Sequence, residues 1–203
     1  MPEIQRINRY DDERFSNTVL YQHGAFLVDD SPCEVEITGT ETAVVRCENQ
    51  EYIAPLLEEF RFFAEHICRF YDEQGKLLTE FQPVKRFALK LDDIQPSQFY
   101  VDEDKLQAVR TFLTKPEDII IPVLSHDGRY VSLDGHTRLA AAIDAGYDTV
   151  LGFCSEFDDY ILDFVVEAQR RGIFSPYDLQ RVSHEKYEVV WNQFCDEFFA
   201  QKQ

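Results

Sequence analysis

Basic residues are scarce in this sequence. Lys and Arg together number 20 against 38 Asp and Glu, which gives the 203-residue chain a formal net charge of −18. Such a charge repels phosphodiester backbones and anionic lipid headgroups, so it argues against nucleic-acid and membrane partners. Long apolar runs are absent too: no window approaches the roughly 20 apolar residues that span a bilayer, and the amino-terminal stretch lacks the apolar core of an export signal. We therefore expect a cytoplasmic protein.

Cysteine is also rare, and its spacing carries no recognisable pattern. The five cysteines are scattered and include no C-x-x-C pair, which is the spacing typical of zinc and thioredoxin-type sites. They are Cys33, Cys47, Cys68, Cys154 and Cys195. We expect all five to be reduced thiols, and we expect no zinc, haem or redox cofactor.

The chain has the composition of a folded protein. Hydrophobic residues make up 44% and aromatic residues 14%, including 17 Phe, which is far from the profile of disorder. No low-complexity linker is visible, and the best boundary lies near residues 76–84. We expect an α+β protein in three parts: residues 1–83, residues 84–155 and a helical extension at 156–203.

Hydrophobic periodicity changes within the first part. Short alternating runs between residues 18 and 47, separated by turn sequences, predict a small four-strand β-meander whose first strand contains Val19–Tyr21. From Glu51, apolar residues recur every three or four positions as far as Tyr71, which predicts one amphipathic helix. Pro55 would lie in the first turn of that helix.

The remainder of the chain reads as alternating strands and helices. The run Ile119–Leu124 is continuously apolar, which suits a buried strand, and Asp127-Gly128 predicts a tight turn into an antiparallel partner. A strong helix former follows and ends at Gly146. The expected elements are strands at 84–90, 119–124, 129–133 and 149–153, and helices at 106–113, 138–143, 156–171 and from 183.

One loop predicts a ligand site. The residues Asp134, Gly135, His136, Thr137 and Arg138 connect a strand to a helix. Backbone N–H groups at a helix start are unpaired and lie at the positive end of the helix dipole, so they bind anions. His136, Thr137 and Arg138 add side-chain donors, and Arg138 can grip a phosphate with two N–H groups.

The same loop has a purely structural interpretation. Asp134 or Thr137 could cap the helix, with Gly135 serving only as a turn and Arg138 pairing with a surface carboxylate. The spacing of the residues does not decide between this interpretation and a phosphate site.

Residues Leu91–Phe153 resemble the ParB/sulfiredoxin-like superfamily. The resemblance rests on an I-x-P-S entry at Ile94–Ser97, a D-K-L-x-x-V helix, the strand P-E-D-I-I-I-P-V-L, and the segment Y-V-S-L-D-G-H-T-R-L-A-A-A-I-D-A-G. It implies a mixed sheet with helices in which the strand–loop–helix holds nucleotide phosphates. The D-G-H-T-R loop is most similar to the D-G-H-H-R loop of the free serine kinases, which implies ATP or ADP with Mg²⁺.

Three departures from the superfamily bear on function. His136 stands where sulfiredoxins carry their nucleophilic cysteine, and no cysteine lies in the loop, so sulfiredoxin chemistry is excluded. The acidic and aromatic residues 156–203 replace the basic helix-turn-helix of partition proteins. Gln98 stands where the serine kinases carry the glutamate that acts as general base, and an amide cannot accept a proton.

A kinase built on this chain would therefore need a base from the neighbouring acidic loop. Asp102, Glu103 and Asp104 are the candidates, with Asp102 and Glu103 preferred as catalytic residues. The same triple could bind Mg²⁺ through one carboxylate, or could simply place negative charge at the start of a helix.

The sequence thus predicts a protein that binds a nucleotide or another phosphorylated small molecule at Asp134–Arg138. It either transfers a phosphoryl group to a small hydroxylated acceptor or acts as a non-catalytic sensing or interaction module. A nuclease or DNA-binding adaptor ranks last because of the net charge. The acceptor and the oligomeric state stay open.

Overall fold

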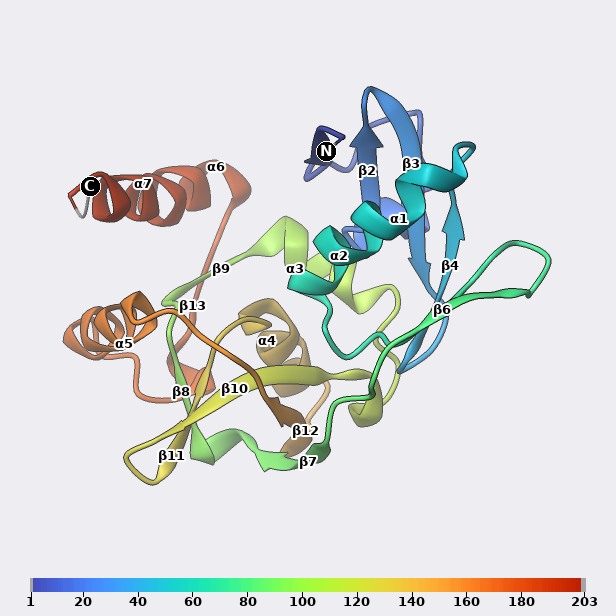
Figure 1. The fold of residues 1–203 in the computed structure, drawn as a ribbon. Helices are drawn as coiled ribbons and strands as arrows, with labels where there is room; N and C mark the ends of the chain where they lie inside the picture. The colour runs from blue at the N-terminus through green and yellow to red at the C-terminus, as the bar shows by residue number, and fades with distance from the viewer. Residues whose placement is uncertain (1, 202–203) are drawn as a thin grey trace. The chain divides into compact units, whose positions relative to one another are not determined.

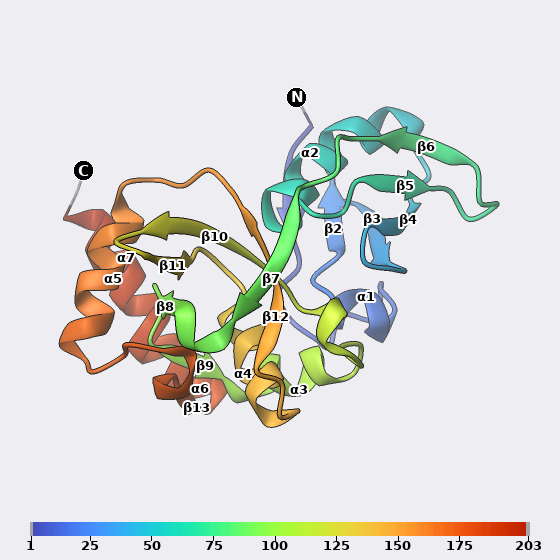
Figure 2. The same cartoon turned by 90° about the horizontal axis from the view of Figure 1, so that it is seen from below.

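The computed structural model describes residues 2–201 and is shown in two views in Figures 1 and 2. The protein is α+β, as predicted, with mixed sheets and separate helices. The chain divides into two compact units, Met1–Val84 and Lys85–Gln203, and residues 156–203 belong to the second. Within the described residues, every helix is too short or too polar to cross a bilayer.

The first unit is built on a six-stranded sheet in which strand order follows chain order. All neighbours are antiparallel except β4 and β5, which are parallel and are connected through helix α2. The strands are β1 (Ile4–Arg6), β2 (Ala25–Val28), β3 (Ser31–Ile37), β4 (Thr42–Arg46), β5 (Arg69–Tyr71) and β6 (Leu77–Glu80).

Helix α2 (Ile53–Phe63) carries the main apolar face of this unit. Its buried residues pack with Phe26, Phe70 and other side chains of the sheet, and Phe60 lies edge-on to both of those rings. Pro55 lies in the first turn, as predicted. The prediction that the helix continues to Tyr71 is wrong, because the chain leaves the helix after Phe63 and pairs with β4 as strand β5.

The predicted meander also differs at its beginning. Asn17–Tyr21 form helix α1 rather than a strand, and the Ser16 hydroxyl caps it by accepting the N–H of Val19. Val19 and Leu20 are both buried, and they pack in one apolar cluster with Phe15 and with residues of β2. Strands β2, β3 and β4 form the antiparallel meander.

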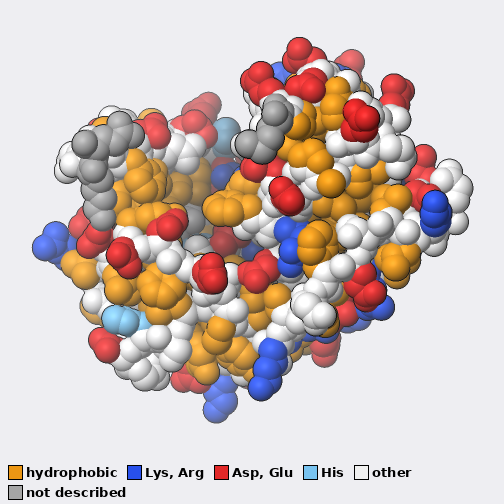
Figure 3. Space-filling view, in the orientation of Figure 1, with side chains coloured by type: hydrophobic (Ala, Val, Ile, Leu, Met, Phe, Trp, Pro, Cys, Tyr) orange, Lys and Arg blue, Asp and Glu red, His pale blue; other side chains and the backbone are white. Residues whose placement is uncertain are grey.

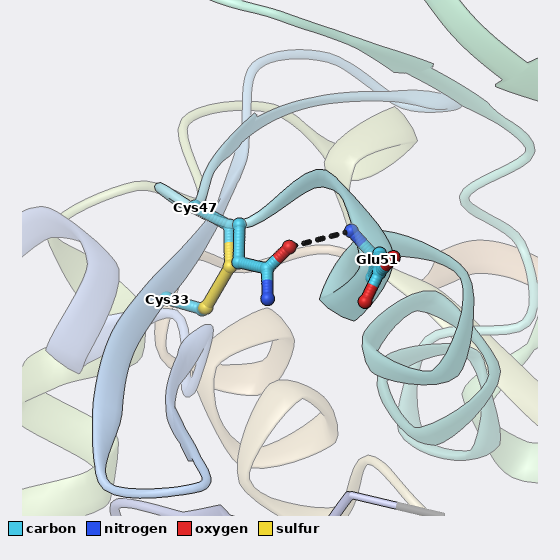
Figure 4. The surroundings of a disulfide bond; sticks show 4 residues. Cys33, Cys47 and Glu51 are labelled. Atoms are coloured by element: carbon cyan, nitrogen blue, oxygen red, sulfur yellow. Dashed lines mark hydrogen bonds between the residues drawn. A yellow bond between two sulfur atoms is a disulfide. The ribbon is translucent and has the colours of Figure 1, made fainter.

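A disulfide joins Cys33 on β3 to Cys47, which directly follows β4 (Figure 4). Because Glu34 lies opposite Arg46 in this antiparallel pair, Cys33 and Cys47 lie opposite each other one step along the same register. The prediction of five reduced thiols is wrong for these two, whereas Cys68, Cys154 and Cys195 are free. The expectation of a cytoplasmic protein loses that support and stays a prediction.

Counting thiols tests this pairing. We expect iodoacetamide to label three cysteines in the denatured, unreduced protein and all five after reduction, because a disulfide sulfur does not alkylate. Peptide mass spectrometry should place the protected pair at Cys33 and Cys47. Labelling of both residues without reduction, in protein purified without reductant, would contradict the disulfide.

The second unit contains a five-stranded mixed sheet in the order β7-β12-β10-β11-β8. Its central strand β10 runs parallel to β12 and antiparallel to β11, which follows after the predicted Asp127-Gly128 turn. The strands are β7 (Arg86–Lys90), β8 (Ile94–Pro96), β10 (Ile120–His126), β11 (Arg129–Ser132) and β12 (Thr149–Cys154).

Helices pack against both faces of β10, which explains why that strand is apolar from Ile120 to Leu124. Ile121 and Val123 contact one cluster, which includes α4 (His136–Asp144), whereas Leu124 contacts α5 (Tyr160–Arg170) in another. Successive side chains of a strand point to opposite faces, so both kinds of position must be apolar here. Helix α3 (Glu103–Arg110) lies beside α4 (Figure 2).

A separate pair of parallel strands brings the carboxyl-terminal segment beside residues 100–102. β9 (Tyr100–Asp102) pairs with β13 (Gln180–Val182). The chain continues from β13 into α6 (His184–Tyr187), a π-helical turn at Glu188–Asn192 and α7 (Gln193–Ala200). Trp191 and Phe194 of this last segment pack edge-on against the buried Phe99. Red acidic side chains outnumber blue basic ones on the face in Figure 3, in keeping with the net charge.

Candidate functional site

The candidate loop turns directly into helix α4. Gly135 is the N-cap residue and has a φ of 83°, in the left-handed region that favours glycine. The structural interpretation of the sequence expected Asp134 or Thr137 to cap the helix, but neither residue occupies the cap position. A glycine cap brings no side chain to accept the N–H groups of the first turn. These donors therefore lie at the positive end of the helix, where anions bind.

His136 points into the protein instead of toward a ligand. Only 4% of the residue is exposed, and its Nε2 accepts the backbone N–H groups of Ser97 and Gln98, each at 3.2 Å. The hydroxyl of Ser132 lies 3.1 Å from the same nitrogen. The ring thus fastens the β8–β9 loop to the start of α4.

These contacts determine the protonation state of the ring. A nitrogen that accepts two N–H groups carries no proton, so the neutral ring holds its hydrogen on Nδ1. Burial, with the positive charge of Arg138 as a smaller contribution, lowers the pKa of His136 to about 4. The Nε2 atom is therefore not the phosphate donor that the sequence suggested.

Arg138 is the cationic group of the loop. Its guanidinium donates to the backbone oxygen of Ile120 at 2.6 Å and to the Asp134 carboxylate at 3.2 Å. A Cβ placed on Gly135 would lie 3.1 Å from Arg138 Nε, so the guanidinium lies directly against the glycine. The Asp134 side chain is 62% exposed and pairs with the same guanidinium. This pair matches the surface ion pair of the structural interpretation.

Gln98 acts as a hydrogen-bond donor. Its side-chain NH₂ donates to the backbone oxygen of Tyr100 and to the Tyr187 hydroxyl, the latter at 3.0 Å. Burial raises the pKa of the Tyr187 hydroxyl, so Tyr187 stays neutral. A glutamate at position 98 would place a carboxylate against the Tyr100 carbonyl, and both groups are hydrogen-bond acceptors. The amide of Gln98 suits this position because its NH₂ is a donor.

The acidic residues differ in their surroundings. Asp102 is fully buried at the end of β9, and its Oδ1 accepts the N–H of Asp104 at 2.9 Å and so caps α3. This is the helix-start role that the sequence left open for the triple. Glu103, by contrast, is exposed in the first turn of α3. A fully buried Asp102 cannot itself reach a substrate hydroxyl, which weighs against its predicted use as a base.

His184 is a candidate that the sequence reasoning missed. Its Nδ1 lies 2.7 Å from Asp102 Oδ2, and the hydrogen bond raises the pKa of His184 above its ordinary value. The side chain is 51% exposed, so its other ring nitrogen is within reach of small molecules. No local pattern marks this residue, because the two partners are 82 positions apart. Only the pairing of β9 with β13 brings them together.

A hollow of about 270 Å³ lies at the opposite end of α4. Arg110, Asp144 and Tyr147 are among its lining residues. Asp144 there pairs with both Arg110 and Arg181, so two guanidinium groups share one carboxylate.

Comparison with known proteins adds little. No protein-family model and no curated protein matches the chain. Among solved structures, protein Atu1540 from Agrobacterium tumefaciens is similar to part of it, with a TM-score of 0.34 and 18% sequence identity. The match covers 48% of this chain and 62% of Atu1540, less than two thirds of that protein. A likeness of this degree carries no argument about function, and the resemblance to the ParB/sulfiredoxin-like superfamily stays a prediction.

Proposed function

We propose that the second unit binds a phosphorylated small molecule, such as ATP or ADP, at the amino end of α4. The observation that carries the proposal is the juxtaposition of three features: a left-handed Gly135, a helix without a capping side chain, and the Arg138 guanidinium lying against that glycine. Backbone N–H groups would hold the phosphate oxygens, with Arg138 supplying the compensating charge and the Thr137 hydroxyl beside it.

The ion pair between Arg138 and Asp134 gives the binding step a specific form. Asp134 is well exposed, so its carboxylate can rotate into water when a phosphate takes its place on the guanidinium. The second bond of Arg138, to the backbone oxygen of Ile120, holds the guanidinium in position meanwhile. Asp134 thus competes with the ligand, and its removal should favour binding.

The surroundings of the predicted catalytic residues support a binding module over a phosphoryl transferase. Gln98 donates both of its side-chain hydrogens to protein oxygens, and Asp102 is buried and engaged in capping. Glu103 is exposed and remains the one residue of the predicted pair that is free to meet water. We infer a non-catalytic ligand-sensing or interaction module, with Mg²⁺ accompanying the nucleotide.

Two variants with opposite expected effects test the proposal by calorimetry with ADP and ATP. Arg138→Ala should weaken binding by about 1.5–3 kcal/mol, the range for a charge-assisted contact. Asp134→Asn should tighten binding, because it removes the competing charge. Arg181→Ala is the matched control: it removes an arginine that pairs with Asp144 near the other end of α4, and should leave affinity unchanged.

The results can overturn the proposal in two ways. If the wild-type protein binds neither nucleotide at concentrations up to about 1 mM, the proposed phosphate site is wrong. Equal affinity in the Arg138 and Arg181 variants would place the ligand elsewhere. Incubation with ATP, Mg²⁺ and free amino acids completes the test, since turnover would favour the transferase over the module.

A further inference from the structure

A histidine and two aspartates from distant parts of the chain converge beside β9. Asp102 ends β9, Asp104 lies in the first turn of α3, and His184 begins α6. Because β9 and β13 run parallel with Val182 opposite Asp102, the residues that follow both strands emerge at the same edge. His184 stands two positions beyond Val182, so the fold itself delivers the imidazole to the carboxylates.

The three side chains present ligand atoms at a spacing that suits one metal ion. One oxygen or nitrogen of each residue lies within 4.8 Å of the others. His184 Nδ1 and Asp102 Oδ2 are 2.7 Å apart. Two ligands bound at about 2.0–2.2 Å to the same ion lie about 3 Å apart when they are adjacent, so a small rotation of the exposed side chains accommodates an ion.

Among the described residues, the one ion-pair partner of Asp102 is His184. The Asp102 side chain is fully buried, and in the described part of the chain neither a lysine nor an arginine pairs with it. Its Oδ1 is held by the N–H of Asp104, which fixes the carboxylate with Oδ2 facing His184. A buried carboxylate is stable when paired with a positive charge, and ligand orientation by such a hydrogen bond is usual around metals.

We propose that Asp102, Asp104 and His184 bind a first-row transition-metal dication. One imidazole and two carboxylates form a mixed nitrogen and oxygen set that suits Zn²⁺ or Mn²⁺ better than Mg²⁺, which prefers oxygen ligands. Three protein ligands leave further coordination positions for water or a ligand. The sequence predicts no zinc, because it contains no metal-ligand spacing. The three proposed ligands come together only in the fold, so no sequence pattern indicates them.

Metal titration of the full chain, without nucleotide, tests this proposal independently of the proposed function. After dialysis against chelator and its removal, calorimetry with ZnCl₂ should give one equivalent bound, with weaker binding of MnCl₂ and weakest of MgCl₂. His184→Gln and Asp104→Asn should each lower the Zn²⁺ affinity at least about tenfold. Both side chains are exposed, so these variants are expected to fold.

Glu103→Gln is the matched control, because it removes an exposed carboxylate from the same turn of α3 without touching the three ligands. It should bind Zn²⁺ like wild type. Absence of stoichiometric Zn²⁺ binding by the wild-type chain would overturn the proposal. So would equal affinity in the His184, Asp104 and Glu103 variants, since the metal would then be bound by other groups such as the free cysteines.

Discussion

Replacing His136 with alanine should lower the free energy of unfolding of the second unit by about 4 kcal/mol. The substitution removes the acceptor of two buried N–H groups, those of Ser97 and Gln98. Each buried donor left without an acceptor costs about 1–3 kcal/mol, and loss of the ring adds a cavity between the β8–β9 loop and α4.

Urea denaturation followed by circular dichroism measures this effect. His126→Ala is the matched control, because that histidine lies at the end of β10 with its side chain 41% exposed. The control should change stability by about 0.5 kcal/mol or less. A His136 variant as stable as the control would show that the ring does not hold the loop.

The same histidine makes stability depend on pH. The pKa of His136 is about 4 in the folded protein, below its ordinary value of 6.5, so the unfolded chain binds the proton more readily. The stabilisation is complete above pH 6.5 and is lost as the pH falls toward 4, with a slope of at most about 1.4 kcal/mol per pH unit. Urea denaturation of wild type and His136→Ala should be compared between pH 4 and 6.5. The free energy of unfolding should fall more steeply with decreasing pH in wild type than in the variant, because the other titrating groups are the same in both.

The second large effect concerns Gly24, in the first unit. A Cβ at this position would lie 2.0 Å from the backbone oxygen of Val35, so an alanine cannot fit without moving strand β3. The backbone of Gly24 also accepts the N–H of Val35 at 2.8 Å, and that bond would be broken or stretched. We expect Gly24→Ala to cost about 3 kcal/mol or more, from overpacking and loss of the bond together.

Hydrogen exchange gives this prediction a local measurement. Amide protons of β2 and β3 should exchange faster in Gly24→Ala, together with a lower midpoint of denaturation. Gly39→Ala is the matched control, because its Cβ would meet only the side chain of Thr42, whose hydroxyl can rotate away. Unchanged amide exchange rates in β2 and β3 would contradict the prediction, because the strands would then accommodate the added methyl group without losing hydrogen bonds.

The elements that the sequence predicted are those determined by local interactions. The β10–β11 hairpin follows from Asp127-Gly128, and the start of α6 from the Ser183 hydroxyl, which accepts the N–H of Lys186. The end of α2 could not be predicted. The apolar spacing continues through Phe70, but pairing of β5 with β4 removes that residue from the helix.

The candidate site divides in the same way. The sequence predicts the candidate loop at Asp134–Arg138 because its turn, helix and cation are adjacent in sequence. The orientation of His136 was not, since its partners Ser97 and Gln98 lie nearly 40 positions away. His184 carries no local signal, and its pairing with Asp102 depends on strands at opposite ends of the second unit's sequence.

We expect the pairing of β9 with β13 to form late in folding. β10, β11, α4 and β12 follow one another within Ile120–Cys154, so they can assemble through short loops. Joining Tyr100 to Gln180 instead closes a loop of some 80 residues, at a larger entropic cost. The loop before α4 can therefore form early in folding, or on a nascent chain. The histidine and aspartate cluster is complete only when the carboxyl-terminal segment has docked.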